Sequence, residues 1–109
     1  MNARRHDRIP YVGPIRISWE DSTGQPKFAI AECLDVSESG IRIEAKEPIS
    51  VRTTVSLLAE RIRLAGSARV KRVTRSGSKC ILGLEMSQPL REQVMAIVRD
   101  QQKPRTAVE

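Results

Sequence analysis

Apolar and polar residues alternate along most of the chain, and this pattern predicts a series of short β-strands. Ile15, Ile17 and Trp19 alternate with polar residues, which is typical of a strand with one buried face. Comparable stretches follow, separated by clusters of turn-forming residues such as the run DSTGQP at 21–26. We therefore predict strands at about residues 15–20, 27–36, 41–45, 51–58, 61–71 and 80–86.

Two of these strands contain irregular positions. In the strand at 61–71 we expect Gly66 to introduce a bend, because glycine weakens a strand interior. In the strand at 27–36, Glu32 interrupts the apolar face and indicates a bulge or an exposed position. The residues that we assign to that buried face are Phe28, Ile30, Leu34 and Val36.

The period of the apolar residues changes near the end of the chain. They recur there at the spacing of an amphipathic helix, at Leu90, Val94, Ile97 and Val98. Ser87 can cap such a helix, and Pro89 fits its first turn. We therefore predict one helix at about residues 88–102.

Short strands followed by one helix indicate an all-β fold with one helix, built as a closed antiparallel β-barrel on which the helix packs. The spacing of the strands leaves no room for the crossover helices that parallel strands need. The 109 residues suffice for one domain. Within it we expect a flexible Arg-rich arm at 1–9, the barrel and helix at 10–102, and a disordered tail at 103–109.

Composition adds two expectations about the core and the surface. Hydrophobic residues make up 39% of the chain, but there is only one Trp, one Tyr and one Phe. Ile, Val, Leu and Ala must therefore fill the core. Lys and Arg outnumber Asp and Glu by 19 to 13, and the resulting net charge of +6 attracts phosphates, nucleic acid, acidic proteins or lipid head groups without choosing among them.

Several classes of function lack the residues that they need. Cys33 and Cys80 form no CxxC pair, and with His6 as the single histidine they are too few for a zinc site, so we expect no metal or cofactor. No apolar stretch approaches the roughly 18 residues of a membrane span, and the N-terminus lacks the apolar core of a secretory signal. We therefore expect a cytoplasmic protein.

Catalysis is disfavoured on similar grounds. The sequence contains neither a glycine-rich phosphate loop nor a GxSxG nucleophile motif. His6 lies in the predicted arm, where it is poorly placed as a general base. A turn explains Asp35 and Glu38 as well as a catalytic carboxylate pair does. We do not expect an enzyme.

Two short motifs could bind a ligand. In the arm, Arg4 and Arg8 are four residues apart, and that spacing puts both guanidinium groups on one side of the chain, whether it is helical or extended. Guanidinium groups can grip phosphate oxygens in a bidentate manner, reach O6 and N7 of guanine, or stack on a base. A solvated basic tail explains the same residues.

The second motif is the run DVSESG at 35–40. Asp35 and Ser37 point the same way at a strand end, where the carboxylate can accept from a guanine edge or an arginine and the hydroxyl can donate to a phosphate or cap the turn. Gly40 permits a positive φ and a close approach of ligand to backbone. An ordinary Asx or Ser turn is an equally simple explanation.

Taken together, the two motifs resemble those of the bacterial PilZ domain family, which carries RxxxR in an N-terminal arm and [DN]xSxxG about one hairpin later. The resemblance extends over about residues 4–100, through the turn RSGSK to the closing run GLEM, where Met86 stands in place of the usual Phe. It implies a six-stranded antiparallel barrel with a C-terminal helix, and a site for the second messenger cyclic di-GMP on the barrel's outer surface.

The same resemblance implies the roles of individual residues. Arg4 and Arg8 would hold guanine and phosphate groups, Asp35 and Ser37 would read a guanine edge, and Gly40 would keep the surface open. The site residues that we predict are Arg4, Arg5, Arg8, Asp35, Ser37 and Gly40, of which Arg5 matches no fixed motif position. Binding would order the arm and signal to an unidentified downstream protein.

Two other functions stay open at this point. Some members of the family lack the arginines and act as protein-interaction adaptors that bind no nucleotide. A small basic barrel can also bind nucleic acid, but such proteins stack bases on aromatic residues, which are scarce here. We therefore expect no nucleic acid polymer as a partner.

Overall fold

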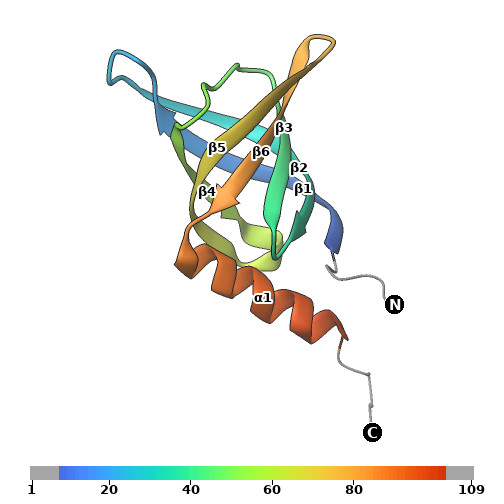
Figure 1. Ribbon diagram of the computed structural model, residues 1–109. Coiled ribbons are helices and arrows are strands. Elements are labelled where there is room, and N and C mark those ends of the chain that lie inside the picture. The colour runs from blue at the N-terminus through green and yellow to red at the C-terminus, as the bar shows by residue number, and fades with distance from the viewer. Residues whose placement is uncertain (1–7, 103–109) are drawn as a thin grey trace, which may run out of the picture.

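Six strands close into one antiparallel barrel in the computed structural model, which describes residues 8–102 (Figure 1). Their order around the barrel is β1-β2-β3-β6-β5-β4, and β4 pairs with β1 to close it. The helix lies across one end of the barrel, and the predicted fold class is confirmed. The elements are β1 (Arg8–Glu20), β2 (Pro26–Ser37), β3 (Gly40–Ala45), β4 (Thr54–Ala59), the 3-10 helix η1 (Glu60–Ile62), β5 (Leu64–Ser76), β6 (Lys79–Met86) and α1 (Gln88–Gln102).

Inward-facing aliphatic side chains fill the barrel, as the scarcity of aromatic residues predicts. In β3 and β6 the buried positions alternate with more exposed ones, so these strands follow the simple pattern of the sequence. Leu90 and Val94 of α1 are fully buried and join this core from one end of the barrel. Cys33 and Cys80 are free thiols within it. Burial of this apolar surface supplies the main favourable free energy of folding.

The prediction for the buried face of β2 was wrong over its first half. Phe28 and Ile30 are 77% and 71% exposed, whereas Ala31 and Cys33 are buried. Register explains the difference, because Ala31 lies opposite the buried Ile15 of β1 and so shares its inward side. A bulge between Cys33 and Asp35 then changes the face, so that Val36 is buried as predicted.

The chain between β4 and β5 also differs from the prediction. The alternating arginines suggested that the fifth strand begins at 61, but residues 60–62 form η1 and β5 begins at Leu64. Arg63 ends η1 in the left-handed conformation with φ 52°, and its backbone N–H donates to the carbonyl of Glu60 at 3.1 Å. A left-handed residue cannot continue a strand, so the turn resets the alternation.

The helix prediction is confirmed at both ends of α1. Ser87 caps it, since its Oγ accepts a hydrogen bond from the backbone N–H of Leu90 at 3.4 Å. The amide of Gln93 fastens α1 to β5 by accepting from the N–H of Ala65 at 3.0 Å and donating to its carbonyl at 2.8 Å. Among the described residues, no helical segment has the length and hydropathy of a membrane span.

Gly66 of β5 gives α1 room to pack. The sequence suggested only a bend at this position and not this packing role. A Cβ on Gly66 would lie 3.0 Å from the Cβ of Leu90, so a side chain there pushes the helix outward. We expect Gly66→Ala to lower the free energy of unfolding by about 1–3 kcal/mol, the usual cost of overpacking. Urea denaturation followed by circular dichroism measures this change.

Gly83→Ala in β6 is the matched control. Its new Cβ would lie 3.6 Å from the nearest atom, the Cβ of Arg72, which is an ordinary contact. Alanine is favoured over glycine in a strand by roughly 0.5–1 kcal/mol, so this variant should be as stable as the wild type or slightly more so. Equal stability of the two variants would contradict the packing role of Gly66.

Candidate functional site

The fold places the backbone of Arg8, the last residue of the first motif, beside the second motif. In the register of β1 with β2, the backbone of Arg8 lies opposite Ser37, and Pro10 lies opposite Asp35. In the register of β2 with β3, Ser37 lies opposite Gly40. The predicted site residues Arg4 and Arg5 lie outside the described residues, as do the ends of the predicted arm and tail at 1–7 and 103–109.

A groove of about 420 Å³ lies on the outer face of β2, β3, β6 and β5. Cross-strand pairing sets its floor, because Asp35 lies opposite Arg42, Arg42 opposite Gly83, and Gly83 opposite Arg72. A single row of residues thus runs across four strands. The polar and small residues that line the groove are Asp35, Ser37, Ser39, Gly40, Arg42, Lys71, Arg72, Thr74 and Gly83.

An ion pair between Asp35 and Arg42 holds one wall of the groove. Oδ2 of Asp35 accepts from Nε of Arg42 at 2.9 Å and from Nη2 at 2.7 Å. The side chain of Asp35 is 12% exposed and that of Arg42 is 55% exposed, so the carboxylate is the more deeply buried partner. A buried carboxylate needs such donors, because loss of its hydration is otherwise uncompensated. The pair therefore fixes the position of an acceptor inside a basic groove.

Ser37 shapes the turn between β2 and β3. Its Oγ accepts from the backbone N–H of Ser39 at 3.2 Å and is hydrogen-bonded to the Oγ of Ser39 at 2.8 Å. Of the two roles predicted for this hydroxyl, turn capping is the one that these bonds describe. Ser37 is only 5% exposed, so it also sets the shape of the groove wall at this end.

The structural reason for a glycine at position 40 differs from the one that the sequence suggested. It does not use a positive φ, which the described glycines adopt at Gly13, Gly24 and Gly77. A Cβ on Gly40 would instead lie 3.0 Å from the carbonyl oxygen of Leu84 in β6. Glycine is therefore required because the backbone of a neighbouring strand approaches closely.

Three basic residues of the groove were missed by the sequence prediction. Arg42 could have been found, since it is outward-facing two residues after Gly40 in a regularly alternating strand. Lys71 and Arg72 could not, because a bulge between Val70 and Arg72 brings both to the outer side of β5. Together these cations give the groove a positive potential that attracts anions.

The chemistry of the groove suits recognition of a nucleotide. Guanidinium and ammonium groups can bind phosphate oxygens, and the carboxylate of Asp35 can accept from the N–H edge of a base. In the described part of the chain, no group of His, Cys, Asp and Glu could hold a metal ion.

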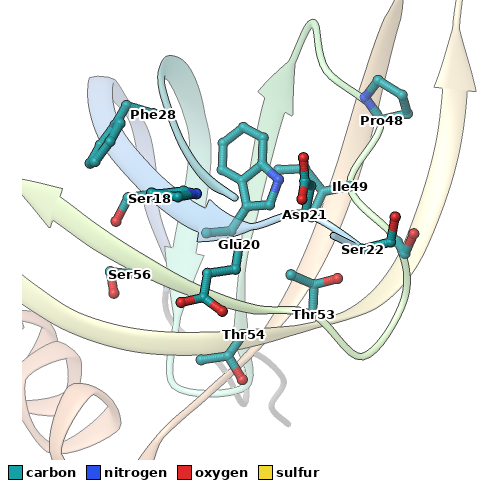
Figure 2. Close-up of a pocket in the computed structure, with 13 residues that line it drawn as sticks. Ser18, Glu20, Asp21, Ser22, Phe28, Pro48, Ile49, Thr53, Thr54 and Ser56 are labelled. Carbon is teal, nitrogen blue, oxygen red and sulfur yellow. The ribbon is translucent and has the colours of Figure 1, made fainter. Parts of the chain in front are cut away.

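A larger hollow of about 830 Å³ lies beside the turn that joins β1 to β2 (Figure 2). Glu20, Phe28 and Ser56 are among the residues that line it, together with several hydroxyl side chains. It contains none of the predicted site residues, and its lining includes two carboxylates and no Lys or Arg. The larger hollow is therefore less suited to an anion than the smaller groove.

The sequence model of the PilZ domain family matches residues 2–100 of the chain. No curated protein sequence matches this chain. Both sequence motifs and the groove lie within the matched range.

Three solved structures, two of them of PilZ domains, have the same fold. The PilZ domain of YcgR from Escherichia coli with c-di-GMP is 14% identical, with 91% of each chain covered and a TM-score of 0.61. MrkH of K. pneumonia, in its complex with c-di-GMP, is 15% identical, with a TM-score of 0.62. The match covers 93% of this chain and 53% of MrkH. The PilZ domain of CeSA from a cellulose synthesizing bacterium is 19% identical, with 89% and 99% covered and a TM-score of 0.55. This chain thus spans about half the length of MrkH.

Cys33 is buried in β2, two residues before Asp35, and this environment leads to a chemical prediction. Burial raises the pKa of the Cys33 thiol to about 12, and the negative charge of Asp35 adds to the rise. In the unfolded chain the pKa returns to about 8.5. At about pH 9 we therefore expect Cys33 to react with a thiol reagent only as fast as the chain unfolds. A Cys80→Ala background isolates this thiol for kinetic labelling.

The same shift affects stability at alkaline pH. Above the unfolded pKa the unfolded chain releases the thiol proton while the folded protein keeps it, so folding becomes less favourable as pH rises. The contribution of Cys33 is complete below about pH 8.5 and falls progressively towards pH 12. Rapid labelling of Cys33 in the native protein at about pH 9 would contradict the burial of its thiol.

Proposed function

Because the chain belongs to the PilZ domain family, we propose that it is a receptor for cyclic di-GMP, which it binds in the groove on β2, β3, β6 and β5. PilZ domains are generally binding domains without catalysis, and they are typically c-di-GMP receptors. The observation that carries the proposal is the strand register: the backbone of Arg8, at the end of the first motif, lies opposite Ser37 of the second, and Asp35 is two residues away along β2.

In this proposal the motif arginines hold the anionic part of the ligand. Arg4 and Arg8 bind guanine and phosphate groups by bidentate hydrogen bonds, and Arg5 assists them. Lys71 and Arg72 form the opposite wall of the groove and add positive charge that attracts the two phosphates of the ligand. The nucleotide thus lies between the arm and the wall on β5.

Asp35 reads the base. Its carboxylate accepts from the N–H edge of a guanine, and this contact takes the place of part of its ion pair with Arg42. The released guanidinium is then available to a phosphate oxygen, so that neither charged group is left without a partner. Binding therefore exchanges an internal ion pair for contacts with the ligand.

The output of the receptor is a change in its N-terminal arm. Residues 1–7 of the predicted arm precede β1, are charged and have little apolar surface to bury, and the nucleotide supplies the contacts that fold them across the groove. A downstream protein senses the ordered arm, or the change in surface potential as two phosphates offset part of the +6 charge.

Calorimetric titration of cyclic di-GMP into the wild type and three variants tests the proposal. We expect saturable binding by the wild type, and Arg8→Ala should weaken it by about 10–150-fold, since a charge-assisted contact contributes about 1.5–3 kcal/mol. Arg72→Ala should weaken it less, by about tenfold, because this residue contributes mainly charge. Arg91→Ala is the control: it removes the same charge from an exposed position on α1, which contributes no residue to the groove.

GTP serves as the control ligand and should give no saturable heat. Absence of cyclic di-GMP binding by the folded wild type would overturn the receptor function and leave the alternative, a PilZ-fold adaptor that binds a protein and no nucleotide. Equal binding by the wild type and Arg8→Ala would instead show that the RxxxR motif does not hold the ligand.

Limited proteolysis with trypsin tests the ordering of the arm. Cleavage after Arg4 and Arg5 should slow in proportion to the bound fraction when cyclic di-GMP is present. Arg105 provides an internal control, because it lies in the opposite terminal segment and its cleavage should not change. Equal cleavage of the arm with and without ligand, at a concentration where calorimetry shows saturation, would contradict this output.

A further inference from the structure

Exposed apolar side chains form a patch on the outer face of β2, β1 and β4. Phe28 and Ile30 are 77% and 71% exposed, and Leu58 is 36% exposed. In the strand register Arg16 lies between Ile30 and Leu58, and Ser18 lies opposite Phe28. Exposed apolar residues that lie this close together are typical of interaction surfaces. We call the surface formed by Arg16, Ser18, Glu20, Phe28, Ile30 and Leu58 the β1 face.

Two charges of opposite sign stand on this face. Arg16 and Glu20 project from the same side of β1 and lie about 13 Å apart along the strand, with Ser18 midway between them. Within residues 8–102 neither side chain has an ion-pair or hydrogen-bond partner. Figure 2 shows Glu20, Phe28 and Ser56 around the same hollow. The face therefore offers both apolar area and uncompensated charge to a partner.

We propose that the β1 face is the interface of a homodimer. A two-fold axis at Ser18 sets two copies of β1 antiparallel across the interface, so that Arg16 of each copy faces Glu20 of the other. Along β1 the order is positive Arg16, neutral Ser18 and negative Glu20. When a second copy runs in the opposite direction, each charge meets one of opposite sign, as an isologous interface requires. The same axis brings Phe28 against Phe28 of the second copy.

The net positive charge of the protein explains why a dimer needs ion pairs at its interface. Each chain carries +6, so two copies repel one another at long range. Two reciprocal Arg–Glu pairs beside buried apolar side chains offset that repulsion at this face. The hollow of about 830 Å³ beside Phe28 leaves room for side chains of the second copy. None of the residues proposed to bind cyclic di-GMP belongs to the β1 face.

Charge exchange provides a sharp test by sedimentation velocity over a range of protein concentrations. We expect the wild type to be dimeric, and Arg16→Glu and Glu20→Arg alone each to weaken self-association by about tenfold or more, because each places like charges opposite one another twice. An equimolar mixture of these two variants should form a heterodimer. The double variant R16E/E20R should dimerise as the wild type does.

The mixture is its own control for folding, since two misfolded variants cannot restore each other's association. Phe28→Ser should weaken the dimer in every background. A wild type that stays monomeric at about millimolar concentration would overturn the proposal and leave the face to a different protein. Single variants that associate like the wild type, or a mixture that stays monomeric, would overturn it as well. Cyclic di-GMP titration of Arg16→Glu separates this test from that of the receptor function, because binding there should be unchanged.

Discussion

The β-bulge in β2 decides which side chains face the core and which face solvent. Leu34 is the extra residue, because Cys33 lies opposite Ile43 and Asp35 lies opposite Arg42. Without it, strict alternation would direct Asp35 into an aliphatic core, where an unpaired carboxylate is very costly. With it, Val36 is buried and Asp35 faces outward to meet Arg42. One inserted residue thus turns a core strand into the wall of a groove.

A second bulge completes the groove from the other side. In β5, Val70 lies opposite Leu84 and Arg72 lies opposite Gly83, which leaves Lys71 as the extra residue. Regular alternation would turn Arg72 inward, whereas the bulge lets Val70 stay buried and directs both cations outward. Bulges are common beside functional sites because they re-aim side chains in this way. The basic character of the groove therefore depends on two local departures from ideal pairing.

Prediction from the sequence succeeded where alternation is unbroken. In β3 and in α1 one apolar period runs through the whole element, so the element and its buried residues could both be predicted. The prediction of buried residues failed in β2 for two reasons. A bulge moves the apolar pattern to the other face, and hydrophobicity alone favours Phe28 over Ala31 as the buried residue. It also failed at Arg63, where a left-handed residue creates a turn that the alternating arginines conceal. The motif residues could be proposed from the sequence because their spacing is local, whereas Arg72 depends on a register that only the folded sheet defines.

The buried acceptor within the basic groove bears on how the proposed receptor could be selective. A groove lined only by Arg42, Lys71 and Arg72 would attract any polyanion, including the backbone of a nucleic acid. Asp35 opposes a ligand that brings phosphates alone, since such a ligand competes for Arg42, repels the carboxylate and weakens the ion pair that holds it. A ligand that presents an N–H edge beside its phosphates satisfies both groups at once. Selectivity of this kind comes from a penalty on the wrong ligand as much as from attraction of the right one.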